Sequence, residues 1–217
     1  MGSGKIPEIV VSSYQKEVAS MALSAEQQQI LSKVRQFVCD TMSHNDPAHD
    51  AAHVERVVKL TLTLCGRYEN VDLFGAQLLA WVHDLNDDKL ESDVGAASVE
   101  NLLCEVGTPK ETVRFVLEGL PFISYRKYPK LGPQVPLEVR IVQDADRMDA
   151  MGAIGIARTF AYGGAKGRSL EDSLAHFDEK LLKLYDLLST DAAREMAQSR
   201  RALLEEFYHQ FHQEWGK

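Results

Sequence analysis

Apolar residues recur at intervals of three and four positions in nearly every segment from Ser24 to the C-terminus. Ile30, Val34 and Val38, for example, fall on one face of a helix, and Ser24 is placed to cap its N-terminus. This spacing is typical of amphipathic helices, and no pair of segments shows the alternation expected of β-strands. The sequence therefore predicts an all-α fold, a single bundle of about eight helices.

The same spacing places the other helices and the breaks between them. Thr108-Pro109-Lys110-Glu111 predicts a capping box with proline in the first turn. Four of the seven prolines fall between residues 120 and 136, which predicts a loop, and a second, glycine-rich loop is expected at Tyr162–Arg168. Helices are expected at residues 48–68, 73–82, 91–106, 137–160 with a break near Gly152, 170–188 and 191–215.

The first twenty residues differ from the rest of the chain. They open with MGSG, and a second methionine, Met21, begins the segment MALSAEQQQI. We expect residues 1–20 to be a leader added in cloning or a disordered segment, and residues 21–217 to form one domain.

Charge and cysteine content exclude several classes of protein. The chain has 24 Lys and Arg against 32 Asp and Glu, a net charge of −8, which argues against a protein that neutralises nucleic-acid phosphates. Three widely spaced cysteines without a CxxC motif indicate a reducing compartment, and neither a membrane span nor a signal peptide is evident. We expect a cytoplasmic protein that handles phosphate, if at all, through local positive charge such as a metal ion.

An ordered series of histidine and aspartate residues is the main chemical signal. His83-Asp84 ends the apolar run LLAWV, where two polar side chains are costly to bury unless a partner compensates. His53 lies 30 residues upstream and Asp146 lies 62 residues beyond Asp84. Two imidazoles and two carboxylates suit a divalent metal ion, although a core histidine paired with an aspartate would also explain the dipeptide.

Five sequence blocks in order make the chain similar to a known family. These blocks are HDAAHVERV, VHD, IVQDADRMDAMGAIGIARTF, YGGAKGR and HFDEKLLKL. From Gln29 onward the chain resembles the HD-domain metal-dependent phosphohydrolases, in particular a branch of small stand-alone proteins that includes nucleotide pyrophosphohydrolases. The family series H…HD…D maps onto His53, His83, Asp84 and Asp146.

The resemblance implies a metal centre and selects one aspartate of QDADRMD. In HD enzymes the ligand precedes a basic residue, which selects Asp146; Asp144 is then expected to be a cap or to support a ligand. The implied cofactor is a divalent ion, Mn or Mg first, with Fe, Co, Ni or Zn as alternatives. A second ion held from the segment PFISY is not expected, because the histidine that some bacterial relatives have there is absent.

Further candidate residues flank these ligands. Asp87 and Asp88 stand at i+4 from His83 and Asp84, where alarmone hydrolases, a distant HD branch, carry a Glu-Asp pair. Either could orient or deprotonate the attacking water, or both could form a solvated helix end. His49 would share a helix face with His53, as a general acid, a supporting donor or a cap.

Scattered basic residues are candidates for binding substrate phosphates. Arg56 falls on the His53 face and could contact a phosphate or an acidic supporting group, and the glycine-rich segment could add backbone N–H donors. If the basic side chains of these candidates converge, their combined positive charge favours a polyphosphate substrate over a monophosphate. The full set is Arg56, Lys127, Lys166, Arg168, His176 and Lys180.

Together these observations predict a hydrolase that cleaves nucleoside triphosphates to the monophosphate and pyrophosphate by metal-assisted attack of water. The alternatives are a nucleoside 5′-monophosphatase, an alarmone hydrolase or a non-catalytic nucleotide-binding module. The expected partner is a small nucleotide rather than a nucleic acid or a membrane, and a homodimer is left open.

Overall fold

The computed structural model describes residues 23–42, 50–85, 96–125 and 127–216. Within these ranges it contains nine α-helices, three short 3₁₀ helices and no strand, which confirms the predicted all-α class. The helices are α2 (Ala25–Met42), α3 (Ala51–Cys65), α4 (Leu73–Val82), α5 (Ala96–Glu105), α6 (Lys110–Gly119), α7 (Leu137–Asp149), α8 (Gly152–Ala165), α9 (Leu170–Glu179) and α10 (Asp191–Trp215). The 3₁₀ helices are η1 (Leu120–Ile123), η2 (Leu181–Lys183) and η3 (Tyr185–Leu187).

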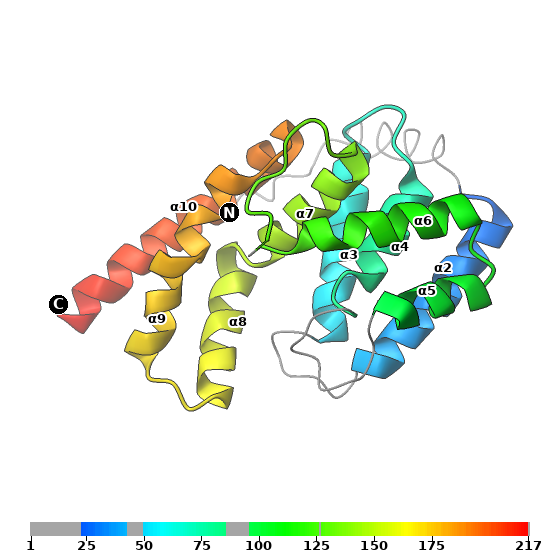
Figure 1. The fold of residues 1–217 in the computed structure, drawn as a ribbon. Helices are drawn as coiled ribbons and strands as arrows, with labels where there is room; N and C mark the ends of the chain where they lie inside the picture. Colours follow the sequence, from blue (N-terminus) through cyan, green and yellow to red (C-terminus); the bar gives the residue numbers. More distant parts are fainter. Residues whose placement is uncertain (1–22, 43–49, 86–95, 126, 217) are drawn as a thin grey trace, which may run out of the picture.

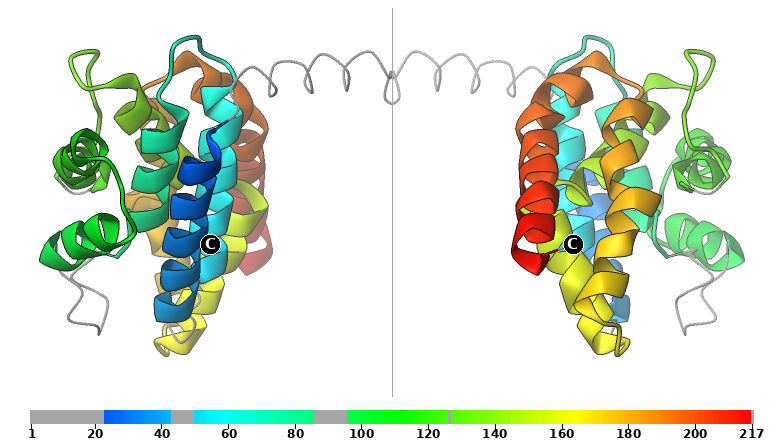
Figure 2. Two further views of the ribbon diagram at one scale, coloured as in Figure 1. Left: turned by 90° about the vertical axis from the view of Figure 1, so that its right-hand side faces the viewer. Right: turned by 90° about the vertical axis from the view of Figure 1, so that its left-hand side faces the viewer.

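Helices α3, α4 and α7 pack against one another at the centre of the molecule (Figure 1). Helix α2 covers one side of α4, and α5 and α6 pair along another side, as the rotated views show (Figure 2). Helices α8 and α9 form an antiparallel pair against which α10 lies. None of the described helices is long and apolar enough to cross a membrane.

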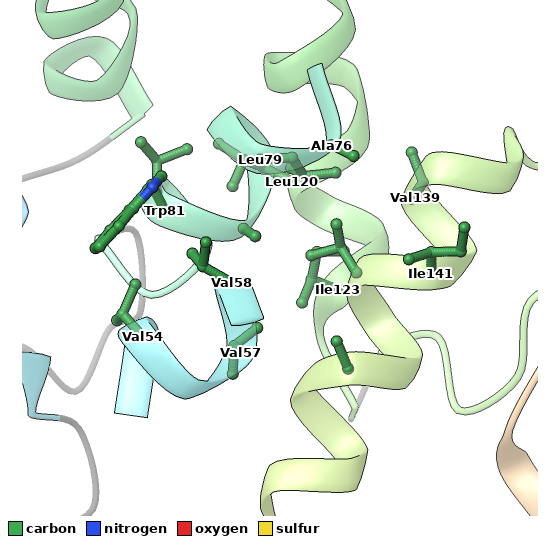
Figure 3. Packing of buried hydrophobic residues seen from close by; sticks show 14 of the residues in the cluster. Val54, Val57, Val58, Ala76, Leu79, Trp81, Leu120, Ile123, Val139 and Ile141 are labelled. Carbon is green, nitrogen blue, oxygen red and sulfur yellow. The ribbon is translucent and has the colours of Figure 1, made fainter. Parts of the chain in front are cut away.

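The core between the central helices is made of aliphatic side chains that are almost completely buried. Val58 of α3 points toward Leu79 of α4, and Ile123 of η1 lies between α3 and Ile141 of α7 (Figure 3). Each such side chain contributes about 1.5–3 kcal/mol when it is removed from water. This packing holds α3, α4 and α7 in fixed positions, and these helices carry the histidine and aspartate series.

Several predicted boundaries are confirmed by local contacts. The Ser24 hydroxyl accepts a hydrogen bond from the Gln27 backbone N–H at 3.1 Å, and the Gln27 side-chain oxygen accepts one from the Ser24 backbone N–H at 2.9 Å, so Ser24 does cap α2. The predicted helix over residues 73–82 matches α4. The break near Gly152 is also present, since α7 ends at Asp149 and α8 begins at Gly152 with a φ of 70°.

Three local predictions are wrong. The Thr108 hydroxyl does not cap α6, because it is buried and has no hydrogen-bond partner within the described part of the chain. Pro109 itself precedes the first turn. A single α-helix was expected over residues 170–188. The α-helix ends at Glu179, and two 3₁₀ turns follow it. Those turns place Leu181 and Leu184 three residues apart on one face, both buried, as 3₁₀ geometry allows.

The third wrong prediction concerns the glycine-rich segment. Tyr162–Ala165 is the last turn of α8 rather than a loop. Gly163 fits there because a Cβ at this position would overlap the Ser173 hydroxyl of α9. Gly167, with a φ of 68°, then turns the chain toward α9.

Asp144, on α7, is buried and binds the two residues that precede α10. Its carboxylate accepts hydrogen bonds from the backbone N–H of Ser189 at 2.8 Å and from the backbone N–H and hydroxyl of Thr190 at 2.8 and 2.7 Å. Burial raises the pKa of Asp144, although these hydrogen bonds oppose the rise. Thr190 is the N-cap of α10, so Asp144 holds the capping residue in place.

We predict that Asp144→Ala lowers the free energy of unfolding by about 2–3 kcal/mol, because buried N–H groups lose their acceptor. Urea denaturation followed by circular dichroism measures the loss. Asp144→Asn keeps one acceptor oxygen and should lose less. Equal stability of the alanine variant and the wild type would contradict this role.

Candidate metal centre

The four predicted ligands come from three helices and meet at one point. His53 lies in the first turn of α3, where the Asp50 side chain caps the helix by accepting from the His53 N–H at 2.8 Å. His83 and Asp84 follow the last residue of α4, and Asp146 lies on α7. The ring nitrogens of both histidines and a carboxylate oxygen of Asp146 lie within 4.8 Å of one another.

The distances within this cluster suit a bound ion. His53 Nε2 lies 3.3 Å from Asp84 Oδ2 and 3.4 Å from Asp146 Oδ1. His83 Nε2 lies 3.5 Å from Asp84 Oδ1 and 3.9 Å from Asp146 Oδ1. Ligands about 2.0–2.2 Å from a shared ion stand about 3–4 Å apart, so these four side chains could ligate one divalent ion.

One buried atom tests whether an ion fits here. The ring of His83 is anchored by its Nδ1, 2.8 Å from the Ala80 carbonyl, which leaves Nε2 facing the cluster. Among the described residues, this buried Nε2 has no hydrogen-bond partner. Buried polar atoms are rarely left unsatisfied, and a metal ion is a partner that imidazole nitrogen accepts. The donor set therefore fits the expected divalent ion.

The cluster is partly open to solvent. The histidine rings are buried, whereas the side chain of Asp146 is 31% exposed and that of Asp84 is 14% exposed. Solvent therefore reaches the cluster from the side of the two carboxylates. This combination of fixed nitrogen donors and accessible oxygen donors is common where a metal assists hydrolysis.

Electrostatic coupling within the cluster shifts two pKa values. Burial would lower the pKa of His53, but hydrogen bonds to Asp146, Asp149 and Asp84 raise it well above its usual value. Burial would raise the pKa of Asp146, but the hydrogen bond from His53 and the charges of the two histidines lower it. These shifts favour the protonated form of His53 and the ionised form of Asp146.

Behind His53 lie two residues, Asp149 and Arg158, to which the sequence pattern assigned no role. Asp149 Oδ2 lies 2.7 Å from His53 Nδ1, and the same carboxylate accepts from Arg56 and Arg158. Asp149 stands at i+3 from Asp146, so helix periodicity alone would have placed it on the same face. Arg158 gave no such signal, because its position depends on the turn between α7 and α8.

The predicted substrate-binding residues are only partly brought together. Arg56 was expected to contact either a phosphate or an acidic supporting group. In the structure it contacts the acidic group Asp149. Burial is the main cause that lowers the pKa of His176. The positive charges of Lys180 and Arg168 lower it further, so both cations lie near His176. The Lys180 ammonium lies 4.9 Å from the ring centre of Tyr125, so α9 meets the loop that contains the exposed Lys127.

The backbone of the glycine-rich segment is not arranged to bind an anion. The N–H groups of Lys166, Gly167 and Arg168 donate to carbonyls of the last turn of α8. The side chains of Lys166 and Arg168 lie 5.6 and 5.3 Å from the ring centre of Tyr162. The expected backbone contribution to phosphate binding is therefore wrong, and only these exposed side chains are left to contact substrate. The other three candidates, His49, Asp87 and Asp88, lie outside the described residues.

Comparison with known proteins gives relatives that cover most of the chain. No protein-family model matches. The uncharacterized protein YpgQ of Bacillus subtilis is 38% identical over 185 residues, 82% of this chain and 90% of its own length. A crystal structure of YpgQ in complex with ADP superposes with a TM-score of 0.76 and 34% identity, over 87% of this chain and 96% of that one. An HD-superfamily hydrolase from Bacillus thuringiensis superposes with a TM-score of 0.70 and 37% identity, over 88% and 98% of the two chains.

We predict that binding of a divalent ion to the metal-free protein at pH 7 releases about one proton per ion, because His53 must give up its Nε2 proton to become a ligand. The affinity should accordingly rise with pH until His53 is neutral. Isothermal calorimetry in two buffers of different ionisation enthalpy measures the proton count. Heats that do not depend on the buffer would contradict the protonation state assigned to His53.

Proposed function

The chain belongs to the HD superfamily of hydrolases, the family of Bacillus subtilis YpgQ, and we propose that it hydrolyses nucleoside triphosphates to the monophosphate and pyrophosphate. The observation that carries this proposal is the convergence of two imidazoles and two carboxylates around the unsatisfied Nε2 of His83. Residues His53, His83, Asp84 and Asp146 would hold the ion. When bound there, a divalent ion supplies Lewis acidity toward water and toward a phosphoryl oxygen.

The remaining chemistry belongs to side chains around the ligands. Water attacks the α-phosphorus, the bond from phosphorus to the α–β bridging oxygen breaks, and pyrophosphate leaves. We assign the orientation and deprotonation of the water to Asp87, with Asp88 beside it, and the protonation of the leaving group to His49. These three assignments rest on the position of the residues in the sequence relative to His53, His83 and Asp84.

Two observations support a nucleotide with more than one phosphate. YpgQ was crystallised with ADP, which carries an adenine nucleoside and a diphosphate. In this chain, the charges of Arg168 and Lys180 both contribute to lowering the pKa of His176, so these two cations lie in one region, to which Tyr125 connects the loop of Lys127. Several cations in one region neutralise a polyphosphate better than one cation does, which favours a triphosphate over a monophosphate. Lys166 completes the proposed substrate-binding set, whereas Arg56, whose guanidinium donates to Asp149, is assigned to the support of that carboxylate.

The mixed donor set is compatible with several divalent ions, of which Mn and Mg are proposed first and Fe, Co, Ni and Zn are alternatives. Imidazole nitrogen and carboxylate oxygen together suit Mn, and Mg is the second candidate. Because the carboxylates are partly exposed, the ion would retain open positions for water and for phosphate oxygens.

We predict that Asp84→Asn and His83→Ala abolish nucleotide hydrolysis and manganese binding together, since each removes one ligand of a four-ligand site. Activity is measured on a panel of nucleotides with several metals, with the products separated by ion exchange, and binding is measured by calorimetry. Pyrophosphate as the product supports the proposal. Inorganic phosphate from monophosphates would indicate a 5′-monophosphatase, pyrophosphate released only from alarmones would indicate an alarmone hydrolase, and nucleotide binding without turnover would indicate a binding module.

We also predict that Lys180→Gln raises the KM for a triphosphate roughly tenfold with little change in kcat, because one charge-assisted contact to phosphate is lost. Lys33→Gln, on the exposed face of α2, is the matched control and should leave both constants unchanged. Steady-state kinetics over a range of nucleotide concentrations gives both values. An unchanged KM in Lys180→Gln would remove this residue from the substrate site.

A further inference from the structure

The Asp149 carboxylate is saturated by hydrogen bonds, although it is only 1% exposed. Its Oδ1 accepts from Arg56 Nε at 2.7 Å, and its Oδ2 accepts from Arg56 Nη2 at 3.0 Å and from Arg158 Nη1 at 2.6 Å. Oδ2 also lies 2.7 Å from His53 Nδ1. A carboxylate held from three sides by charged and ring donors has a single orientation.

This orientation determines which nitrogen of His53 faces the cluster. An ionised carboxylate only accepts hydrogen bonds, so His53 Nδ1 carries a proton and donates a hydrogen bond to Asp149. Nε2 is then the atom directed at Asp84 and Asp146, at 3.3 and 3.4 Å. His83 is oriented in the same way, but by the backbone carbonyl of Ala80. Asp149 therefore orients the ring of His53, as the main chain orients the ring of His83.

The turn between α7 and α8 is shaped to bring Arg158 onto Asp149. Gly152 adopts a φ of 70° and packs against Arg200, whose guanidinium donates to the Met148 carbonyl. A Cβ on Gly155 would overlap the carbonyl of Ala150, so only glycine lets α8 start this close to the end of α7. Arg158 follows on the same helix, nine residues after Asp149.

Two arginines compensate the buried Asp149 carboxylate. Arg56 holds it with two hydrogen bonds and Arg158 with one. A carboxylate that is bonded to the second nitrogen of a ligand histidine fixes the orientation of the ring and strengthens its basicity, and with it the affinity of that ring for metal.

We propose that Asp149 is a positioning residue that fixes the ring of His53 for metal binding, and that Arg56 and Arg158 hold Asp149 in place for this task. The inference rests on the proposed function in one respect, namely that His53 is a metal ligand. Asp149 lies at Nδ1 of His53, whereas Nε2 faces Asp84 and Asp146, so Asp149 is not proposed as a ligand.

The test is the affinity of the metal-free protein for manganese, measured by isothermal calorimetry without nucleotide. Asp149→Asn should bind manganese 10–100-fold more weakly than the wild type, because the isosteric amide accepts a weaker hydrogen bond from His53. Asp144→Asn is the matched control: it is the same substitution at another buried position of α7, in a residue that contacts Ser189 and Thr190 and not His53. The control should lower the melting temperature and leave manganese affinity within about twofold of the wild type.

Unchanged affinity in Asp149→Asn, or an equal loss in Asp144→Asn, would overturn the inference. If Asp149→Asn does not fold, the wild type supplies the second measurement: nitrogen-15 NMR of the zinc-loaded protein should show His53 protonated at Nδ1 and ligated through Nε2. Ligation through Nδ1 would overturn it. Because no nucleotide is present in either experiment, these outcomes are independent of whether the protein cleaves triphosphates.

Discussion

A carboxylate that is removed from water must be paired, and α7 carries two buried carboxylates and one half-buried carboxylate among its last six residues. Asp144 is directed to the N-terminus of α10, Asp146 to the two histidines, and Asp149 to His53 and two arginines. Each pairing fixes another part of the fold to this helix. The position of α10, the metal centre and the start of α8 therefore all depend on how the acidic end of α7 is compensated.

The same helix joins the site to the core. Its apolar residues, such as Ile141, pack with η1 and the central helices, while its polar residues bind the surrounding loops. Gln143 donates to the carbonyls of Phe122 and Tyr128, and Arg147 donates to those of Tyr128 and Leu187. A well-packed scaffold holds the ligands close to the geometry that an ion requires, so little reorganisation accompanies binding.

Much of this arrangement could be predicted from the sequence, because helix periodicity and the ordered ligand series are local signals. The all-α class and the segment of α4 that precedes His83 and Asp84 followed directly from them. The partners of Asp149 could not be predicted in the same way, since Arg158 reaches it only through a glycine turn whose geometry depends on packing. The glycine-rich end of α8 was misjudged for a similar reason: Gly163 serves contact with α9 rather than a loop.

We propose that two histidines and two aspartates from three helices hold one divalent ion that assists hydrolysis. Anomalous diffraction from crystals soaked in manganese tests it most directly. A single strong peak about 2.0–2.2 Å from Nε2 of His53 and of His83, and in contact with the carboxylates of Asp84 and Asp146, is the expected result. A peak at other residues, or no peak between these four side chains at saturating manganese, would contradict the claim.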